Sequence, residues 1–377
     1  MAEAIGAANG NSTGPQPRRV LMSLDAVGGV WRYAMDLASA LREQGFSFVF
    51  AGFGPGPSVA QVEEAQRLGT LVWLEAPLDW TAQNEAALDG VPGLIAALAE
   101  EHQVDLVHLN LPSQAYGLKL DVPVLVVSHS CVVTWFAAVR NGPVPLDWHW
   151  QQRLNRGGFD HADAVVAPSE THADMLRRSY GPIKGLQVIY NGAHPTPSEI
   201  DKAELVFAAG RWWDDGKNGR VLDQAAEHTV WPVVMAGANS GPNGQFLAIE
   251  HADHRGELTH GGVKALMAEA AIVASPSLYE PFGLAPLEAA GARAALVLAD
   301  IPTYRELWDG VALFAGPHDP KAFADRINQL AGDPALRAEL AAKGQERAQR
   351  FSVAAQAGAM GELYRQLLSA GAVAGRA

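Results

Sequence analysis

The stretch from Ala271 to Gly291, AIVASPSLYEPFGLAPLEAAG, decides how the rest of the sequence is read. It begins with small and β-branched residues, and Pro276 then prevents further strand pairing, which predicts a short buried strand ending near Ser275. A tight connection with proline and glycine follows. Pro286 is well placed as the first residue of a new helix, where its missing N–H costs nothing. The stretch therefore predicts a strand, a loop and a helix in close succession.

Two glutamates lie in this strand-loop-helix unit. Glu280 belongs to the loop, and Glu288 is expected in the first turn of the helix, beside free backbone amides and the positive end of the helix dipole. This combination suits a ligand that carries both hydroxyl groups and phosphates. Each glutamate alone also has an ordinary interpretation, because Glu288 could simply favour the helix start and Glu280 could be a solvated loop carboxylate.

The segment SLYEPFGLAPLEA, residues 277–289, resembles the signature of retaining GT-B glycosyltransferases of family 4, in which seven residues separate two glutamates. Pro281, Phe282 and Gly283 also agree with that pattern. The resemblance implies that Glu288 holds the ribose of a nucleotide. It likewise implies that Glu280 lies against the donor sugar.

Length and charge restrict the possible functions. The chain has 377 residues, enough for two domains of about 150 to 200 residues each. Its net charge is −13, and up to residue 190 it has 12 basic and 19 acidic residues, so the first half is not basic. This balance argues against binding to nucleic acid and against strong adhesion to an anionic membrane.

The single cysteine, Cys131, excludes an intrachain disulfide framework and fits a reducing cytoplasm. Residues 1–17 have no basic segment followed by an apolar one, so we interpret them as a disordered leader rather than a secretion signal. The longest apolar run, residues 122–139, contains Ser128, His129 and Ser130. It is better explained by a buried strand and a turn than by a membrane span.

The first half alternates apolar strands with helical patterns, which predicts a parallel, doubly wound α/β sheet. Strands are expected at 19–24, 46–52, 104–109, 122–128, 164–168 and 186–190, and helices at 30–44, 92–102 and 170–180. In such sheets ligands bind at the carboxyl ends of the strands, where Gly28, Gly29, Asn110 and His129 stand. The glycine pair would let a ligand approach the backbone closely, although such a pair is often only a turn. The family resemblance places His129 beside the donor sugar; without it, a structural role is equally compatible.

The segment from Trp135 to Arg156 shows no regular period and contains several aromatic residues and prolines. We therefore expect an irregular aromatic loop. It could form a platform for a sugar acceptor, since sugars pack their apolar faces on aromatic rings, or it could be a hydrophobic cluster that anchors the loop. The sequence leaves both interpretations open.

The second half repeats the alternation of strands and helices. Strands are expected at 204–209 and 231–236, and helices at 221–228, 262–270, 333–350 and 353–368; residues 296–300 continue the pattern of the family that the chain resembles. Arg211 and Lys217 flank the turn after the first of these strands, where fixed cations could neutralise a diphosphate. The resemblance implies this role for both. It also places the nucleobase near residues 254–257, whereas the bulky pair Trp212 and Trp213 departs from the family pattern.

These observations predict an α/β protein of the GT-B type, with two Rossmann-like domains that face a cleft. The expected divisions are a leader at 1–17, an acceptor domain at 18–192, a nucleotide-sugar domain at 193–350 and a final helix at 351–377 that crosses back. The linker is expected at 191–197, where asparagine, glycine and two prolines cluster.

The resemblance implies a retaining glycosyltransferase that moves a hexose from a UDP- or GDP-linked sugar to an acceptor hydroxyl. The donor site would comprise Gly28, Gly29, Arg211, Lys217, Phe282, Gly283, Leu284 and Glu288, with His129 and Glu280 as the catalytic residues. No metal site, cofactor or nucleic-acid partner is expected, and a soluble small molecule or glycan is favoured over a lipid-linked acceptor. A GT-B isomerase or phosphorylase, or a module that only binds sugar nucleotides, remains an alternative.

Overall fold

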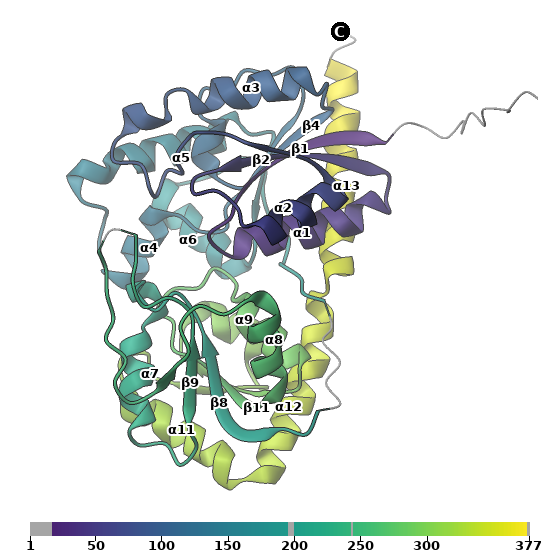
Figure 1. Ribbon diagram of the computed structural model, residues 1–377. Coiled ribbons are helices and arrows are strands. Elements are labelled where there is room, and N and C mark those ends of the chain that lie inside the picture. Colours follow the sequence, from purple (N-terminus) through teal and green to yellow (C-terminus); the bar gives the residue numbers. More distant parts are fainter. Residues whose placement is uncertain (1–16, 195–199, 243, 375–377) are drawn as a thin grey trace, which may run out of the picture.

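The computed structural model describes residues 17–194, 200–242 and 244–374, and it contains two parallel β-sheets with helices on both faces (Figure 1). The strand order of the first sheet is β3-β2-β1-β4-β5-β6-β7. Its strands are β1 (Arg18–Asp25), β2 (Phe46–Phe53), β3 (Gly69–Trp73), β4 (Leu106–Leu109), β5 (Val124–Val127), β6 (Ala164–Ala167) and β7 (Leu186–Val188). The chain reverses its direction of winding beside β1, as a doubly wound sheet requires.

Helices cover both faces of the first sheet. They are α1 (Gly29–Arg42), α2 (Val59–Leu68), α3 (Val91–Glu101), α4 (Val132–Val139), α5 (His149–His161) and α6 (Glu170–Tyr180). Each face has its own buried cluster of apolar side chains. This double burial explains why the central strands are continuous apolar runs, without the alternation of a half-exposed sheet.

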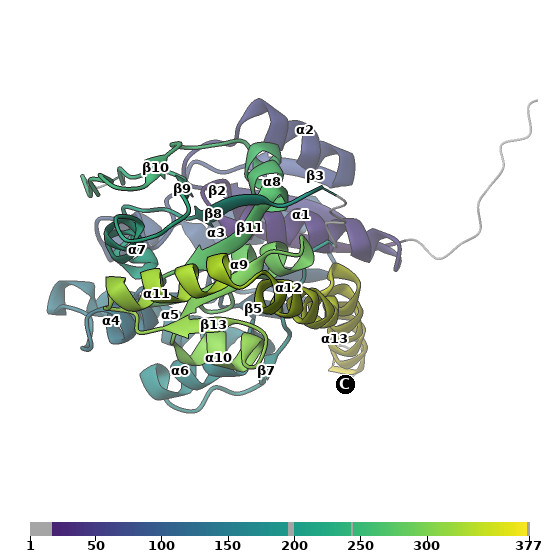
Figure 2. The same ribbon diagram turned by 90° about the horizontal axis from the view of Figure 1, so that it is seen from below.

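The second sheet has the strand order β10-β9-β8-β11-β12-β13 (Figure 2). Its strands are β8 (Ala203–Ala209), β9 (Val233–Ala236), β10 (Asp253–His254), β11 (Ala270–Ser275), β12 (Ala295–Ala299) and β13 (Leu313–Ala315). Its helices are α7 (Gly219–Ala226), α8 (His260–Glu269), α9 (Leu284–Gly291), α10 (Pro302–Trp308), α11 (Pro320–Gly332) and α12 (Pro334–Ala348). Short 3₁₀ turns are η1 (Glu85–Leu88), η2 (Pro112–Ala115), η3 (Leu146–Trp148), η4 (Asp215–Lys217) and η5 (Gln349–Phe351).

The last helix, α13 (Val353–Ala374), extends from the second half to the first (Figure 1). Gln44 Nε2 donates to the carbonyl oxygen of Ala357 at 3.2 Å, and the rings of Phe46 and Tyr364 pack edge to face with centroids 5.2 Å apart. The chain passes between the halves near residue 193 and again at the start of α13. The two crossings lie side by side, since Ala193 and Ser352 form a parallel bridge.

Several predicted elements agree with the structure. The α/β class with two parallel sheets is confirmed. Helix α6 begins and ends as predicted, and the Ser169 hydroxyl caps it by accepting from the His172 N–H. The cap of α12 at Asp333 is also confirmed, since its carboxylate accepts from the Leu336 N–H at 2.9 Å. Residues 1–16 of the predicted leader and residues 195–197 of the predicted linker lie outside the described residues.

Two predictions about local structure are wrong, and two further elements of the first half had no prediction. Helix α9 begins at Leu284, so Pro286 is its third residue and Glu288 lies in the second turn rather than the first. The segment from Trp135 to Arg156 is not an irregular loop, because most of it belongs to α4 and α5. Its helical period was obscured by the prolines between the two helices. Helix α2 and strand β3 were not predicted at all.

Candidate active site

Two loops of the second half are held together at the carboxyl edge of its sheet. The Leu278 N–H donates to the Gly216 carbonyl oxygen at 2.8 Å. Asn218 adopts a left-handed conformation, with φ of 55°, and its Nδ2 donates to the Pro276 carbonyl oxygen at 2.9 Å. The loop after β8 and the loop after β11 therefore form one rigid unit.

This unit brings a predicted cation and a predicted carboxylate into contact. Lys217 forms an ion pair with Glu280, whose carboxylate also accepts from Ser277 Oγ at 3.3 Å. The side chains of Lys217 and Glu280 are 24% and 12% exposed, so the pair is largely shielded from water. The attraction within a pair of this kind is stronger than in a surface ion pair, because water screens it less.

Arg211 lies on the other side of the same loop. Its guanidinium lies 3.6 Å from Asp214 and 5.4 Å from the ring centre of Trp213. The unexpectedly bulky tryptophan pair has a structural role, because Trp213 stacks on Arg211 and Trp212 is buried with its indole N–H bonded to the Ala236 carbonyl oxygen. Arg211 remains 41% exposed and can reach a ligand.

The predicted glycine pair lies where the two halves approach each other. A Cβ atom on Gly28 would lie 3.8 Å from Arg211 Nη1, and one on Gly29 would lie 3.5 Å from Leu284 Cδ1. Gly28 precedes α1, and Leu284 is the first residue of α9. The starts of two helices, each with free backbone N–H groups, thus lie close together where the two halves meet.

The turn before α9 requires glycine. Gly283 has a φ of 91°, and a Cβ atom there would approach Tyr304 Cε1 to 3.0 Å. The neighbouring Phe282 is buried, so its side chain anchors the backbone of this turn in the core. The amides from Phe282 to Leu284 are consequently presented at one defined place at the helix start.

Glu288 lies further along α9, in a partly buried position. Burial raises the pKa of its carboxyl group, the charge of Lys264 on α8 opposes this rise, and the charge of Asp36 on α1 adds to it. Asp36 and Lys264 were not singled out from the sequence. They lie within helices whose patterns carry no local signal of a site.

His129 belongs to the first half and follows β5. Its Nε2 lies 2.8 Å from Asn110 Oδ1, and the same oxygen lies 3.2 Å from Nε2 of the buried His108. The orientation of the Asn110 amide is fixed, because its Nδ2 donates to the Ser23 carbonyl oxygen at 2.6 Å. An amide oxygen can only accept, so both imidazoles carry their proton on Nε2.

This assignment leaves Nδ1 of His129 as a bare acceptor. Burial, together with the smaller effects of the neighbouring His108 and His172, lowers the pKa of His129 to about 3. The ring of Tyr33 packs against it edge-on, with centroids 4.3 Å apart. A neutral imidazole with a fixed tautomer can accept a hydrogen bond from a hydroxyl group of a ligand.

The C-terminal helix completes this network. The Tyr364 hydroxyl on α13 lies 2.6 Å from His108 Nδ1, which must accept because the His108 proton is on Nε2. A chain of side chains therefore connects α13 to His129 through His108 and Asn110. Asn110 had been noted only for its place at a strand end.

On the side of the cleft away from α13, direct contacts join the two halves. Trp135 Nε1 donates to Asp214 Oδ1 at 3.0 Å, and the hydroxyls of Thr134 and Tyr279 lie 2.7 Å apart. Trp135 also packs against Phe136, which contacts Trp148. Of the two interpretations of this aromatic segment, the structure favours the anchoring cluster, here one that also contacts the second half.

Helix α6 provides a further contact between the halves. Glu306, on α10, accepts the N–H groups of Glu170 and Thr171 at 2.9 and 2.8 Å and so caps the start of α6. Ser169 Oγ donates to the Pro281 carbonyl oxygen at 2.6 Å, next to the loop that carries Glu280. The two halves thus share a helix cap.

The remaining predicted features are placed as follows. His254 Nε2 lies 2.8 Å from the Gly237 carbonyl oxygen, and Arg255 pairs with Asp253. The nucleobase position near these two residues stays a prediction. Asp25, at the end of β1, was missed although it follows the same strand-end rule; burial raises its pKa, and the nearby charge of Arg211 opposes the rise. Within the described ranges, no group of three or more His, Cys, Asp or Glu side chains is arranged to hold a metal ion.

Comparisons with known proteins agree with this arrangement. Residues 27–196 match the family described as Glycosyltransferase Family 4, and residues 220–347 match Glycosyl transferases group 1. D-inositol 3-phosphate glycosyltransferase of Xylanimonas cellulosilytica is 28% identical to this chain, and the alignment covers 90% of this chain and 92% of the relative. Alpha-maltose-1-phosphate synthase of Mycolicibacterium smegmatis is 27% identical, with 68% and 76% coverage.

Solved structures show the same fold. Sucrose-phosphate synthase of Thermosynechococcus elongatus superposes with a TM-score of 0.77 at 19% identity, covering 94% of this chain and all of the other. HepE of Anabaena in complex with UDP-glucose gives a TM-score of 0.73 at 19% identity, with 92% and 99% coverage. The two family matches together span most of both halves, and the chain belongs to the family 4 glycosyltransferases of the GT-B type.

Proposed function

We propose that this glycosyltransferase moves a hexose from a UDP- or GDP-linked donor to an acceptor hydroxyl, with retention of the anomeric configuration and without a metal ion. The observation that carries the proposal is the meeting of the two halves: Arg211 faces Gly28 while Leu284 faces Gly29. Cations and helix-start amides are thereby gathered at one place, which suits a diphosphate.

In this proposal the second half binds the donor. Arg211 and Lys217 contact the diphosphate, Glu288 contacts the ribose, and Glu280 contacts the sugar together with the amides at the start of α9. The negative charge on the diphosphate grows as it leaves, so fixed cations and amides favour the transition state over the bound donor. The ion pair between Lys217 and Glu280 would hold the lysine in place before the donor arrives.

The transfer step follows from these roles. The bond between the anomeric carbon and the phosphate oxygen breaks, and its electron pair stays on the phosphate. The acceptor oxygen bonds to the anomeric carbon from the same face and gives its proton to the departing phosphate oxygen. No protein base is required for this step. His129 would accept a hydrogen bond from a sugar hydroxyl through its bare Nδ1 and thereby orient the ring.

A panel of UDP- and GDP-linked sugars, offered with and without acceptors, tests the proposal. Transfer predicts that release of nucleoside diphosphate rises when an acceptor is present and that the product keeps the donor's anomeric configuration by NMR. An isomerase or phosphorylase would convert the donor alone or with inorganic phosphate. A binding module would raise its melting temperature with a donor yet form no product.

Glu288→Gln is expected to separate binding from stability. If the carboxylate holds the ribose hydroxyls, donor affinity should fall by about 1.5 to 3 kcal/mol, the usual value of a hydrogen bond to a charged group. Burial raises the pKa of Glu288 above its unfolded value, so the ionised group costs stability above that pKa, and the cost disappears as the pH falls through it. The variant should therefore melt at a higher temperature than the wild type at neutral pH.

A 2′,3′-dideoxy nucleoside diphosphate is the matched control ligand. It should bind the wild type and the Glu288→Gln variant about equally, because it offers no ribose hydroxyls to either. If both proteins discriminate equally against the dideoxy ligand, Glu288 does not contact the ribose.

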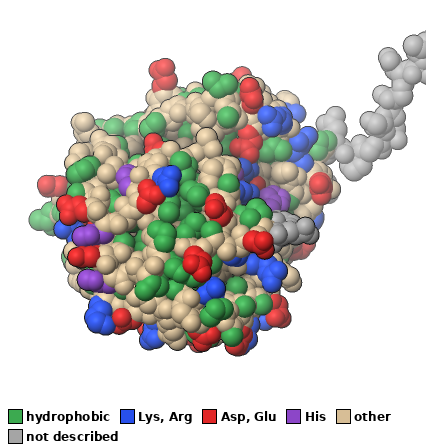
Figure 3. Space-filling model, turned by 60° about the horizontal axis from the view of Figure 1, so that its bottom comes forward, with side chains coloured by type: hydrophobic (Ala, Val, Ile, Leu, Met, Phe, Trp, Pro, Cys, Tyr) green, Lys and Arg blue, Asp and Glu red, His purple; other side chains and the backbone are tan. Residues whose placement is uncertain are grey.

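We further propose that the acceptor is a soluble small molecule or glycan and that the reaction occurs in the cytoplasm. No helix within the described ranges is long and apolar enough to cross a membrane. Acidic and basic side chains are mixed over the face shown in Figure 3. The excess of acidic residues in the first half, 19 against 12, also disfavours an anionic surface.

A sedimentation experiment checks the proposed independence from membranes. The protein is expected to stay in the supernatant with liposomes that contain anionic lipid, even at low salt, where electrostatic adhesion is strongest. Liposomes of neutral lipid serve as the control. Pelleting of most of the protein with the anionic liposomes alone would contradict the choice of a soluble acceptor.

A further inference from the structure

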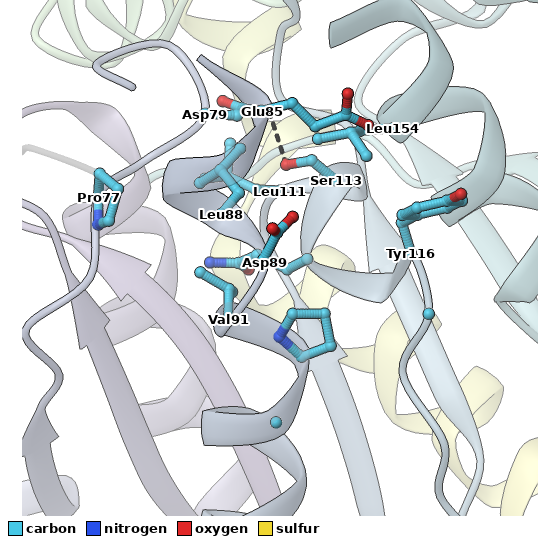
Figure 4. A pocket seen from close by; sticks show the side chains of 14 residues that line it. Pro77, Asp79, Glu85, Leu88, Asp89, Val91, Leu111, Ser113, Tyr116 and Leu154 are labelled. Carbon is cyan, nitrogen blue, oxygen red and sulfur yellow. Dashed lines mark hydrogen bonds between the residues drawn. The ribbon is translucent and has the colours of Figure 1, made fainter. Parts of the chain in front are cut away.

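A cavity of about 320 Å³ lies in the first half, between the loop after β3, the turn η1 and the loop after β4 (Figure 4). This volume is at the lower end for small-molecule sites, which span about 300 to 1,000 Å³, so it suits a single sugar-sized ring better than a polymer. The residues that line it are Pro77, Asp79, Glu85, Leu88, Asp89, Val91, Pro92, Gly93, Leu111, Ser113, Gln114, Tyr116, Gly117 and Leu154.

The cavity adjoins the network that holds His129. Gln114 lines the cavity, and its Oε1 accepts from Ser23 Oγ at 2.7 Å. The same Ser23 residue binds both the amide N–H and the side chain of Asn110, which in turn contacts His129. Gln114 therefore connects the wall of the cavity with the residues beside the cleft.

The topology of the first sheet indicates the same location. Both the loop after β3 and the loop after β4 leave the carboxyl edge of the first sheet, where ligands of such sheets bind. A ring in the cavity would thus lie on the cleft-facing edge of the half that does not carry the diphosphate loops.

The ionisable side chains that line the cavity are all acidic. Asp79, Glu85 and Asp89 belong to the lining (Figure 4), and none of the lining residues is lysine or arginine. Asp79 is only 6% exposed and accepts from Ser113 Oγ at 2.7 Å. Arg153, which does not line the cavity, forms an ion pair with Glu85 and offsets part of its charge. Burial raises the pKa of Asp79, so the exposed Asp89 is the strongest source of negative charge at the cavity.

We propose that this cavity is the acceptor site and that it selects an uncharged or amine-bearing ring with several hydroxyl groups, while excluding phosphorylated rings. This inference rests on the proposed function. Carboxylates accept hydrogen bonds from hydroxyl and ammonium groups, whereas a phosphate would meet the like charge of Asp89. The proposed acceptor carries no phosphate and thereby differs from the inositol 3-phosphate in the name of the Xylanimonas relative.

Equilibrium binding to the full chain with saturating UDP tests this selectivity. The probes are two matched pairs, glucose with glucose 6-phosphate and glucosamine with glucosamine 6-phosphate. Titration calorimetry or ligand-observed NMR should show that each unphosphorylated ring binds at least about tenfold more tightly than its phosphate. Equal or tighter binding of the phosphates, or no binding of any of the four probes, would overturn the proposal.

Two charge variants locate the binding. Asp89→Arg places a cation at the cavity, and its exposed position makes the substitution compatible with folding. The preference for the unphosphorylated ring should shrink by about tenfold or reverse. Asp121→Arg changes the net charge equally at an exposed position outside the lining and should leave the preference unchanged. Equal effects of both variants would show that net charge, rather than this cavity, sets the preference.

A product assay separates this inference from the proposed function. Selective binding of unphosphorylated rings without transfer from any nucleotide sugar would reject the transfer reaction and support the selectivity of the cavity. Transfer to phosphorylated rings in preference to their unphosphorylated partners would support the transfer reaction and reject the inference.

Discussion

Lys217→Ala is expected to lower kcat by about 10²- to 10³-fold, the usual effect of removing a group that stabilises developing charge in a transition state. The affinity for the nucleoside diphosphate alone should fall by a smaller amount, about 1.5 to 3 kcal/mol. The lysine is shielded and held beside Glu280, so its charge acts on the departing phosphate with little screening by water. Steady-state kinetics and titration of the diphosphate measure the two effects separately.

The ion pair complicates this variant and requires two controls. Removing the lysine leaves Glu280 unpaired in a largely buried position, which by itself disturbs the loop. The double variant Lys217→Ala with Glu280→Gln removes that unpaired charge. Its affinity for the nucleoside diphosphate should stay as low as that of Lys217→Ala. Arg220→Ala removes an exposed cation from α7 and should change neither quantity. Full diphosphate affinity in the double variant would exclude Lys217 from the phosphate site.

His129→Ala is expected to reduce transfer by at least about 100-fold while the affinity for the nucleoside diphosphate changes by less than about threefold. The histidine belongs to the first half, whereas Arg211 and Lys217 belong to the second, so its loss should affect the orientation of the sugar and not the hold on the diphosphate. A collapse of diphosphate affinity in a folded His129→Ala protein would contradict this division between the halves.

Asn110→Asp provides a pH test of the same assignment. A carboxylate in place of the amide would raise the pKa of His129 from about 3, because a nearby negative charge favours the imidazolium. Once protonated, His129 has no bare nitrogen to accept a sugar hydroxyl. The variant should lose activity as the pH falls through this raised pKa, in a range where the wild type loses none through His129. Identical pH profiles of activity for the two proteins would contradict the proposal that neutral His129 accepts a hydrogen bond from the sugar during transfer.

Sequence reasoning predicted the parts of the fold that depend on local patterns. The buried parallel strands could be predicted because both faces of each sheet are covered, which makes the strands continuous apolar runs. The caps at Ser169 and Asp333 follow from side-chain chemistry within a few residues. The places of Arg211, Lys217 and Glu280 followed from the strand-end rule and the family signature, and the structure brings the last two into contact.

The remaining features depend on contacts between distant residues. Tyr364 reaches His108 across 256 positions of sequence, and nothing in the pattern of α13 marks that residue. The start of α9 depends on the backbone of Gly283, whose left-handed conformation allows the helix to begin before Pro286. The proposed acceptor cavity is lined by four separate segments of the chain, and none of them carries a local sequence signal of a site.

The cap that Glu306 places on α6 would bear on the timing of catalysis if the halves separate to admit a donor or release a diphosphate. Two backbone N–H groups would then lose their carboxylate acceptor and turn to water. A residue outside the donor and acceptor sites would thereby add to the energetic cost of separation. In many enzymes departure of the product limits turnover. Here the residence time of the spent nucleotide would depend on how firmly one glutamate holds the end of a helix.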